Sequence, residues 1–133
     1  MELIKWLDGY SVGIEEVDNQ HKVLVEIINE LFTQISQGKA KDNLNEIFDR
    51  LTEYTKVHFK DEEAMLVKFA YPDIISHRFE HNKFVKKLSE MKLEFDSSKI
   101  TISLEILNFL KDWFINHILI TDMKYSEYIK NQV

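Results

Sequence analysis

Apolar residues recur along most of this chain at alternating steps of three and four positions, the spacing of one face of an α-helix. The first such stripe begins at Val17 and ends before Gly38, a residue suited to the C-terminal cap of a helix. Three further stripes follow it. After an irregular arm at residues 1–17, the pattern predicts helices over residues 18–37, 42–70, 72–96 and 101–128.

Individual residues set the expected helix boundaries. Asp42 or Asn43 is expected to cap the second helix, because short polar side chains accept hydrogen bonds from the first turn. Pro72 should end that helix before Tyr71, and it can itself begin the third helix. A last break is expected at three short polar residues, Asp96, Ser97 and Ser98.

Four long helices joined by short loops predict an all-α fold, an antiparallel up-down four-helix bundle with an irregular N-terminal arm. Only three Gly and one Pro occur, which favours helices over strands. No repeat or linker divides the 133 residues, so we expect one domain spanning residues 1–133.

Composition excludes several function classes. The net charge is −6 with both signs interspersed, whereas nucleic-acid or anionic-membrane binding would need a clustered basic face. The absence of cysteine excludes disulfides, thiolate zinc sites and iron–sulfur clusters. No apolar run could span a bilayer, and residues 1–8 lack the apolar core of a signal peptide. We therefore expect a cytoplasmic protein without membrane insertion.

All five histidines fall on the apolar stripes: His21, His58, His77, His81 and His117. A lone histidine on such a face is usually a core residue with one hydrogen-bond partner, but that interpretation does not suit all five. The starts of the first and third helices share one end of an up-down bundle with the ends of the second and fourth. The five side chains are therefore expected at the same height.

Two pairs have the spacing of neighbours on one helix face. Glu62 follows His58 by four positions, and His81 follows His77 by four, so each pair can bind one metal or bridge two. Glu63 is off the stripe and is expected on the solvated surface.

Asp122 fits the pattern less simply. It follows His117 by five positions, which places it about 140° away around an ideal helix. The pairing therefore requires a locally altered turn or a long reach.

Buried imidazoles with acidic neighbours are costly unless a cation satisfies them, so the cluster predicts a metal site. Five imidazoles and two carboxylates exceed what one tetrahedral zinc can use, but they suit two iron ions in a bundle core. If both carboxylates and one solvent-derived oxo or hydroxo group bridge, a metal with three histidines is closed. A metal with two keeps one open position, where we expect reversible binding of a small ligand. The predicted ligands are His21, His58, Glu62, His77, His81, His117 and Asp122.

Four apolar residues surround the proposed open position in the sequence: Phe59, Trp113, Phe114 and Ile118. They are equally what a bundle core requires, but at the open position they would exclude water and anions. Tyr54 and Tyr125 are interpreted as structural hydroxyls.

Several segments together form a specific pattern: Trp6 with Ser11-Val12-Gly13-Ile14, Asp18-Asn19-Gln20-His21, His58-Phe59-Lys60-Asp61-Glu62-Glu63, His77-Arg78-Phe79-Glu80-His81, and Trp113 through His117 to Asp122. This pattern resembles the hemerythrin family, in particular its single-domain bacterial members, the bacteriohemerythrins. The resemblance covers almost the whole chain. It implies a four-helix bundle around a non-haem di-iron centre with an oxo or hydroxo bridge.

The resemblance also implies a role for each residue. His77, His81 and His117 would hold the closed iron, His21 and His58 the open one, and Glu62 and Asp122 would bridge. Dioxygen would bind the open ferrous iron and be held as hydroperoxide, in a pocket lined by the four apolar residues named above. The implied function is oxygen transport, storage or delivery, and a protein partner, if there is one, would be an oxygen-consuming enzyme or a reductase.

Two alternatives remain. Residues His77 to His81 also match the H-x-x-E-H motif of zinc proteases, with Glu80 as the base, but three histidines would stay unexplained. Alternatively, the same iron ligands could serve an enzyme that reduces peroxide or nitric oxide, or an oxygen or iron sensor, or an iron buffer. Turnover needs a reductant, and the sequence contains no flavin or rubredoxin-like module, so we expect a binding protein rather than an enzyme.

Overall fold

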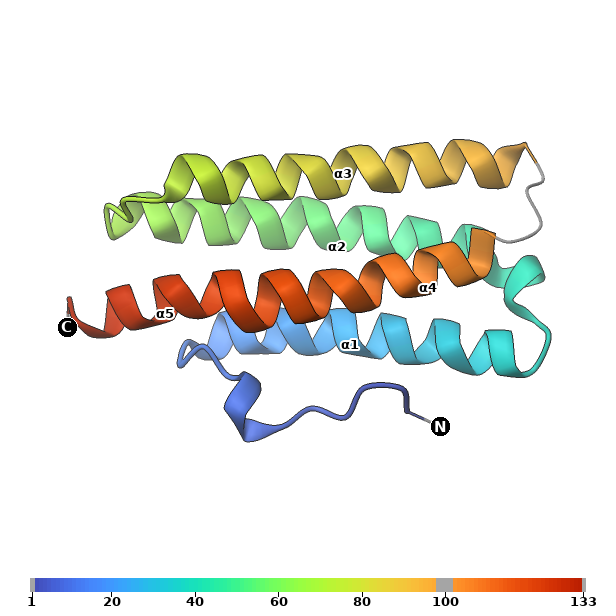
Figure 1. The fold of residues 1–133 in the computed structure, drawn as a ribbon, viewed down its shortest axis with the longest axis horizontal. Coiled ribbons are helices and arrows are strands. Elements are labelled where there is room, and N and C mark those ends of the chain that lie inside the picture. The colour runs from blue at the N-terminus through green and yellow to red at the C-terminus, as the bar shows by residue number, and fades with distance from the viewer. Residues whose placement is uncertain (1, 98–101, 133) are drawn as a thin grey trace.

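The computed structural model describes residues 2–97 and 102–132, which form helices packed side by side (Figure 1). An arm containing the short 3-10 helix η1 (Asp8–Tyr10) leads into α1 (Glu15–Ser36), followed by α2 (Ala40–Lys68) and α3 (Ile74–Asp96). The fourth rod is continuous through α4 (Ile102–Trp113), the π-helix η2 (Phe114–Thr121) and α5 (Asp122–Lys130). The predicted all-α, up-down four-helix bundle is confirmed.

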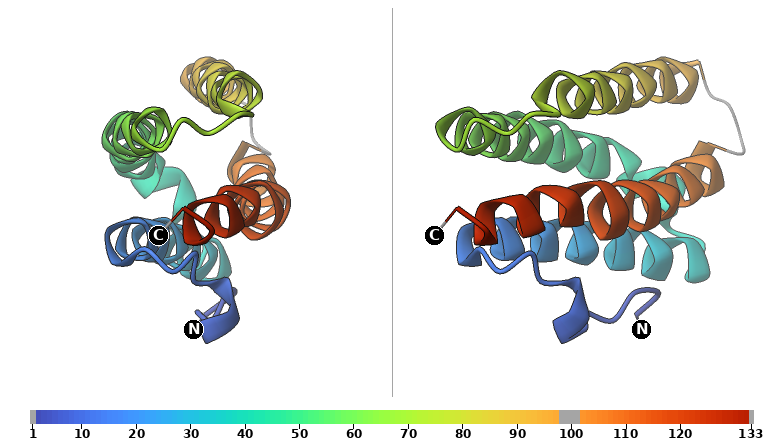
Figure 2. Two further views of the ribbon diagram at one scale, coloured as in Figure 1. Left: turned by 90° about the vertical axis from the view of Figure 1, so that its left-hand side faces the viewer. Right: turned by 60° about the vertical axis from the view of Figure 1, so that its left-hand side comes forward.

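Successive rods run in opposite directions, and the fourth lies against both the first and the third (Figure 2). The starts of α1 and α3 therefore share one end of the bundle with the ends of α2 and α5 (Figure 1). None of the described helices is both long and apolar enough to cross a membrane.

Two apolar clusters fill the interior, and along every rod at least one predicted ligand lies between them. The larger cluster includes Leu24 of α1 and Phe59 of α2, and the smaller includes Val17 of α1 and Leu66 of α2. In α1, His21 lies between Val17 and Leu24. In α2, Glu62 lies between Phe59 and Leu66. The polar cluster is thus closed off by hydrophobic side chains at both ends.

The helix ends differ from the prediction by a few residues. α2 begins at Ala40, ahead of both predicted caps, and no side chain caps it. The predicted cap is wrong: the Asn43 amide instead donates a hydrogen bond to the carbonyl oxygen of Lys39 at 3.1 Å. Pro72 lies in the turn before α3 and does not form its first residue. The expected break at residues 96–98 begins where α3 ends, while Ser98 and the expected helix start at Thr101 lie outside the described residues.

The turn after α2 passes through Ala70, whose φ of 53° lies in the left-handed region. The N–H groups of Ala70 and Tyr71 donate to the carbonyls of Val67 and Leu66 at 3.0 and 2.9 Å, the paired hydrogen bonds of a Schellman motif. Gly38 makes the equivalent turn after α1 with a φ of 70°. Alanine carries a conformational cost there that glycine does not.

We predict that Ala70→Gly raises the free energy of unfolding by about 0.5–1 kcal/mol, because glycine relieves the left-handed strain and the exposed side chain packs little. Urea denaturation of the metal-free protein measures this change. Gly38→Ala is the matched control: its added Cβ would meet no atom within 4 Å, so it should destabilise through conformation alone. A destabilised Ala70→Gly protein would contradict the prediction.

Candidate metal centre

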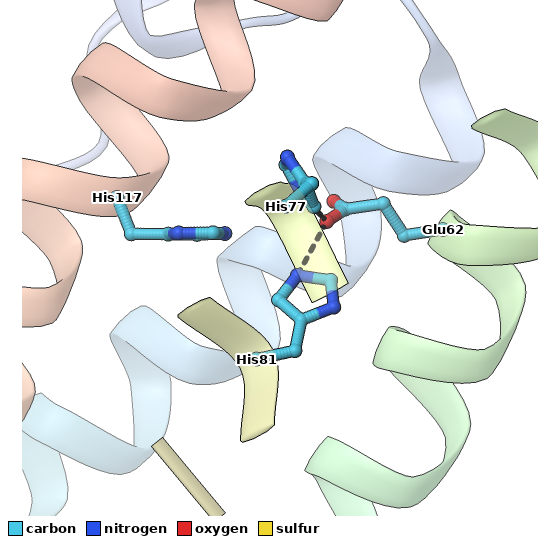
Figure 3. A group of neighbouring side chains, drawn as sticks. All are labelled: Glu62, His77, His81 and His117. Atoms are coloured by element: carbon cyan, nitrogen blue, oxygen red, sulfur yellow. Dashed lines mark hydrogen bonds and ion pairs between the residues drawn. The ribbon is translucent and has the colours of Figure 1, made fainter. Parts of the chain in front are cut away.

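All seven predicted ligands meet inside the bundle, and none is more than 2% exposed. α1 supplies His21, α2 supplies His58 and Glu62, α3 supplies His77 and His81, η2 supplies His117, and α5 supplies Asp122. Figure 3 shows four of them, with three imidazoles from two different rods converging on the Glu62 carboxylate.

The two oxygens of Glu62 face different imidazoles. Its Oε1 lies 2.6 Å from Nε2 of His77 and 2.9 Å from Nε2 of His81. Its Oε2 lies 3.3 Å from Nε2 of His58 and 3.8 Å from Nε2 of His21. The carboxylate therefore stands between two groups of histidines.

Asp122 divides its oxygens in the same way. Its Oδ1 lies 3.0 Å from Nε2 of His117 and 3.2 Å from Nε2 of His77, whereas Oδ2 lies 3.1 Å from Nε2 of His21. The centre thus contains a three-imidazole group (His77, His81 and His117) and a two-imidazole group (His21 and His58), with both carboxylates shared between them. The three-imidazole group with Glu62 could hold a metal ion, and so could the two-imidazole group with both Glu62 and Asp122.

The π-helix η2 brings Asp122 into this arrangement. Its hydrogen bonds link residues five apart, so positions five apart lie on the same face. The N–H of Asp122 donates to the carbonyl of His117, and their side chains meet at the centre. The locally altered turn that the sequence required is present.

The outward nitrogen, Nδ1, of three imidazoles donates to a side-chain oxygen. The acceptors are Glu63 for His81 at 2.8 Å, Glu80 for His117 at 3.1 Å and Gln20 for His58 at 2.6 Å. A hydrogen bond at Nδ1 fixes the ring and leaves Nε2 free to bind a metal, as is usual for metal-binding histidines.

The sequence pattern did not predict these three acceptors of the Nδ1 hydrogen bonds. The expectation that Glu63 lies on the solvated surface is wrong, because its carboxylate accepts hydrogen bonds from His81 and from Arg78 Nε at 3.2 Å. Glu63 is off the core stripe of α2, but it faces the neighbouring helix α3. A usable signal exists: Gln20, Glu63 and Glu80 each adjoin a predicted ligand in the sequence.

The charges of the centre compensate one another. Burial alone would lower the pKa of the imidazoles, but contacts with Asp122 and Glu62 raise the pKa of His21 to about 9 and that of His77 to about 10. Burial would raise the pKa of Glu62, but the surrounding imidazoles hold it well below its usual value. Protons would therefore occupy His21 and His77 in the metal-free centre, and a metal ion would displace them.

Several buried polar atoms of the centre have no hydrogen-bond partner among the described residues. Those facing the interior of the centre are Nε2 of His21, His81 and His117 and both carboxylate oxygens of Asp122, and Nδ1 of His21 also has no partner in the described parts of the chain. The atoms facing the interior approach one another without the alignment of a hydrogen bond. Two ligands bound at right angles, each about 2.1 Å from a metal, are about 3 Å apart, close to the spacing found here. The donor set therefore fits metal ions.

Of the four predicted pocket residues, two pack directly on ligand rings. Phe59 stacks on His81 and Trp113 on His117, each with ring centroids 3.9 Å apart. Both therefore lie against the three-imidazole group. Phe114 and Ile118 are buried in the larger apolar cluster. That these residues line an oxygen pocket stays a prediction.

Two buried tyrosines adjoin the centre in different ways. The hydroxyl of Tyr125 donates to Oε2 of Glu62 at 2.9 Å and so helps to orient this carboxylate. Tyr54 stacks on His58 with centroids 5.3 Å apart, and its buried hydroxyl has no hydrogen-bond partner among the described residues.

Comparison with known proteins gives a consistent result. Residues 12–129 match the family model of the hemerythrin HHE cation binding domain. The chain is 33% identical to a bacteriohemerythrin of Stenotrophomonas maltophilia over 131 residues, covering 98% of this chain and 84% of the relative. It is 32% identical to a bacteriohemerythrin of Clostridium acetobutylicum, covering 92% and 98% of the two chains. A crystal structure of a hemerythrin mutant superposes with a TM-score of 0.85 at 27% identity, covering 96% of this chain and 97% of that one.

We predict that Tyr125→Phe lowers the free energy of unfolding of the metal-free protein by about 1.5–3 kcal/mol, because a hydrogen bond to a buried carboxylate is lost. Tyr54→Phe is the matched control, since it removes a buried hydroxyl without a partner and should leave stability unchanged or raise it. Urea denaturation compares the two. Equal destabilisation by both substitutions would contradict the assigned contacts.

We predict that His77→Ala binds fewer metal ions than the unaltered protein, because His77 contacts both shared carboxylates. Metal analysis after anaerobic loading with ferrous iron and desalting provides the measurement. Ile75→Ala, which alters a side chain that is 80% exposed two positions earlier, serves as the control and should load fully. Unchanged iron content in His77→Ala would refute its assignment as a ligand.

Proposed function

We propose that this chain, which belongs to the hemerythrin family, binds dioxygen reversibly at a pair of iron ions held by its seven buried ligands. The observation that carries the proposal is the division of five imidazoles into groups of three and two around two shared carboxylates. Such a division makes the two metal positions unequal.

The number of ligands supports one open position. Three imidazoles, two carboxylate oxygens and one bridging oxo or hydroxo group would complete six-fold coordination beside His77, His81 and His117. Beside His21 and His58 the same count reaches only five. When bound, the iron pair supplies the electrons and the free coordination position that dioxygen binding requires.

The side chains around the centre favour binding over reduction of the ligand. Glu62 and Asp122 are the only buried acids in the described parts of the chain, and the pKa of each is lowered by its imidazole neighbours despite burial. Neither can act as a proton donor near neutral pH. Reductive cleavage of an O–O bond needs a general acid, so the lack of a protonated, buried carboxyl group among the described residues supports a carrier or storage protein.

The zinc-protease alternative gains no support from the geometry. Glu80, its would-be base, accepts hydrogen bonds from His117 Nδ1 and from the Thr121 hydroxyl. It therefore lies behind an imidazole, outside the converging Nε2 atoms. A di-iron enzyme acting on peroxide or nitric oxide, a sensor and an iron buffer would use the same ligands, and experiment must separate them from a carrier.

The test is an oxygenation cycle. The iron-loaded protein is reduced anaerobically, exposed to air and then depleted of oxygen while its visible spectrum is followed. We expect the spectrum to return to that of the reduced form over repeated cycles without net release of peroxide. Irreversible conversion to the diferric form, accelerated by peroxide or nitric oxide, would favour an enzyme instead.

Phe114→Ala should retain its iron but lose the oxygenated form several-fold faster, because truncation of this buried ring opens a cavity in the apolar cluster and lets water approach the centre. Phe109→Ala, the same truncation five positions earlier and at a partly buried position, is the control. Rates of spectral decay in air measure both variants. Identical decay in the two would remove Phe114 from the proposed pocket.

A further inference from the structure

The two imidazole groups differ in what lies behind them. In the three-imidazole group, Nδ1 of His81 donates to the Glu63 carboxylate and Nδ1 of His117 donates to the Glu80 carboxylate. In the two-imidazole group, Nδ1 of His58 donates to a neutral amide, that of Gln20. Nδ1 of His21 is buried and has no hydrogen-bond partner among the described residues.

The amide of Gln20 is held in this orientation from its other side. Its Nε2 donates to Oδ2 of Asp61 at 2.9 Å, which directs Oε1 toward His58. The carboxylates have partners of their own: Glu63 also accepts from Arg78, and Glu80 also accepts from Thr121. Asp61 thus brings a negative charge near His58 only through the intervening amide, whereas Glu63 and Glu80 contact their imidazoles directly.

The outer acceptor changes the electron density at the inner nitrogen. A carboxylate at Nδ1–H draws the proton away from the ring and makes Nε2 a stronger donor, which favours the more highly charged state of a bound metal. An amide oxygen, which carries no net charge, strengthens Nε2 as a donor less than a carboxylate does. The metal position beside His81 and His117 is therefore the easier one to oxidise, and the position beside His58 is the harder one.

We propose that Gln20, Glu63 and Glu80 are positioning residues that set unequal reduction potentials for the two metal positions. Glu63 and Glu80 lower the reduction potential of the closed position, so that an iron ion there would lose an electron first. The neutral Gln20 leaves the potential of the open position higher, so that an iron ion there would stay ferrous before dioxygen binds. This inference rests on the proposed function, because it assumes that two iron ions occupy the centre.

The experiment exchanges amide and carboxylate in both directions. Gln20→Glu places a carboxylate of the same shape behind His58, and Glu63→Gln removes one from behind His81. The two one-electron potentials of the iron-loaded protein are measured by spectroelectrochemical titration. We expect Gln20→Glu to lower the higher potential by about 59 mV, a tenfold change for a one-electron couple. We expect Glu63→Gln to raise the lower potential by a similar amount.

Both substitutions should therefore narrow the gap between the potentials while moving their mean in opposite directions. Glu46→Gln controls for net charge, because this exposed residue lies on α2 well away from the centre, and it should change neither potential. Far-UV circular dichroism of the metal-free protein controls for structural damage and should show the same helix content in all three variants.

Potentials that stay unchanged, or that shift equally in Gln20→Glu and Glu46→Gln, would overturn the proposal, as would a wider gap in Gln20→Glu. If Gln20→Glu does not load with iron, Glu63→Gln and Glu80→Gln provide the test. The proposal is refuted if the lower of the two potentials rises in neither variant. An unaltered protein that binds no iron pair would instead refute the proposed function, and this is established before any variant is measured.

Discussion

Two carboxylates without access to water, Glu62 and Asp122, impose the constraint on which the rest of the structure depends. Burying a charge is strongly unfavourable unless opposite charge and hydrogen bonds compensate for it. Five imidazoles surround these carboxylates, and they in turn are too many to be satisfied by two acids alone. Metal ions resolve both difficulties, because they carry the positive charge and occupy the free nitrogens. The bundle therefore places the metal ligands of all four rods at the same height along its axis.

The sequence was sufficient to predict the bundle and the convergence of its histidines. Leu24 and Phe59 illustrate why, since each belongs to an apolar stripe whose period specifies a helix and whose phase specifies its buried face. His117 and Asp122 show how a mismatch can also be informative. Their five-residue separation contradicted a regular α-helix, and the π-helix resolves it. The count of five histidines predicted one closed and one open position, and the family resemblance assigned each histidine to one of the two. The distances from Glu62 and Asp122 give the same groups of three and two histidines, while the closed and open roles stay a prediction.

Other features could not be predicted from a single stripe. Glu63 and Glu80 lie off the core faces of their own helices, and only the packing of neighbouring rods shows that they contact His81 and His117. The start of α2 was misplaced for a related reason: Asn43 is a good capping residue in isolation, yet the helix extends ahead of it without a side-chain cap. Periodicity identifies which residues are buried, whereas the contacts between helices determine which polar residues support them.

The account makes its central claim about the number and position of the metal ions. Anomalous diffraction at the iron absorption edge, from crystals of the iron-loaded protein, tests it most directly. We expect two peaks roughly 3–4 Å apart, the spacing of known two-metal sites, each lying between Glu62 and Asp122. One peak should be next to His77, His81 and His117, and the other next to His21 and His58. A single peak, or peaks outside this cluster, would contradict the account.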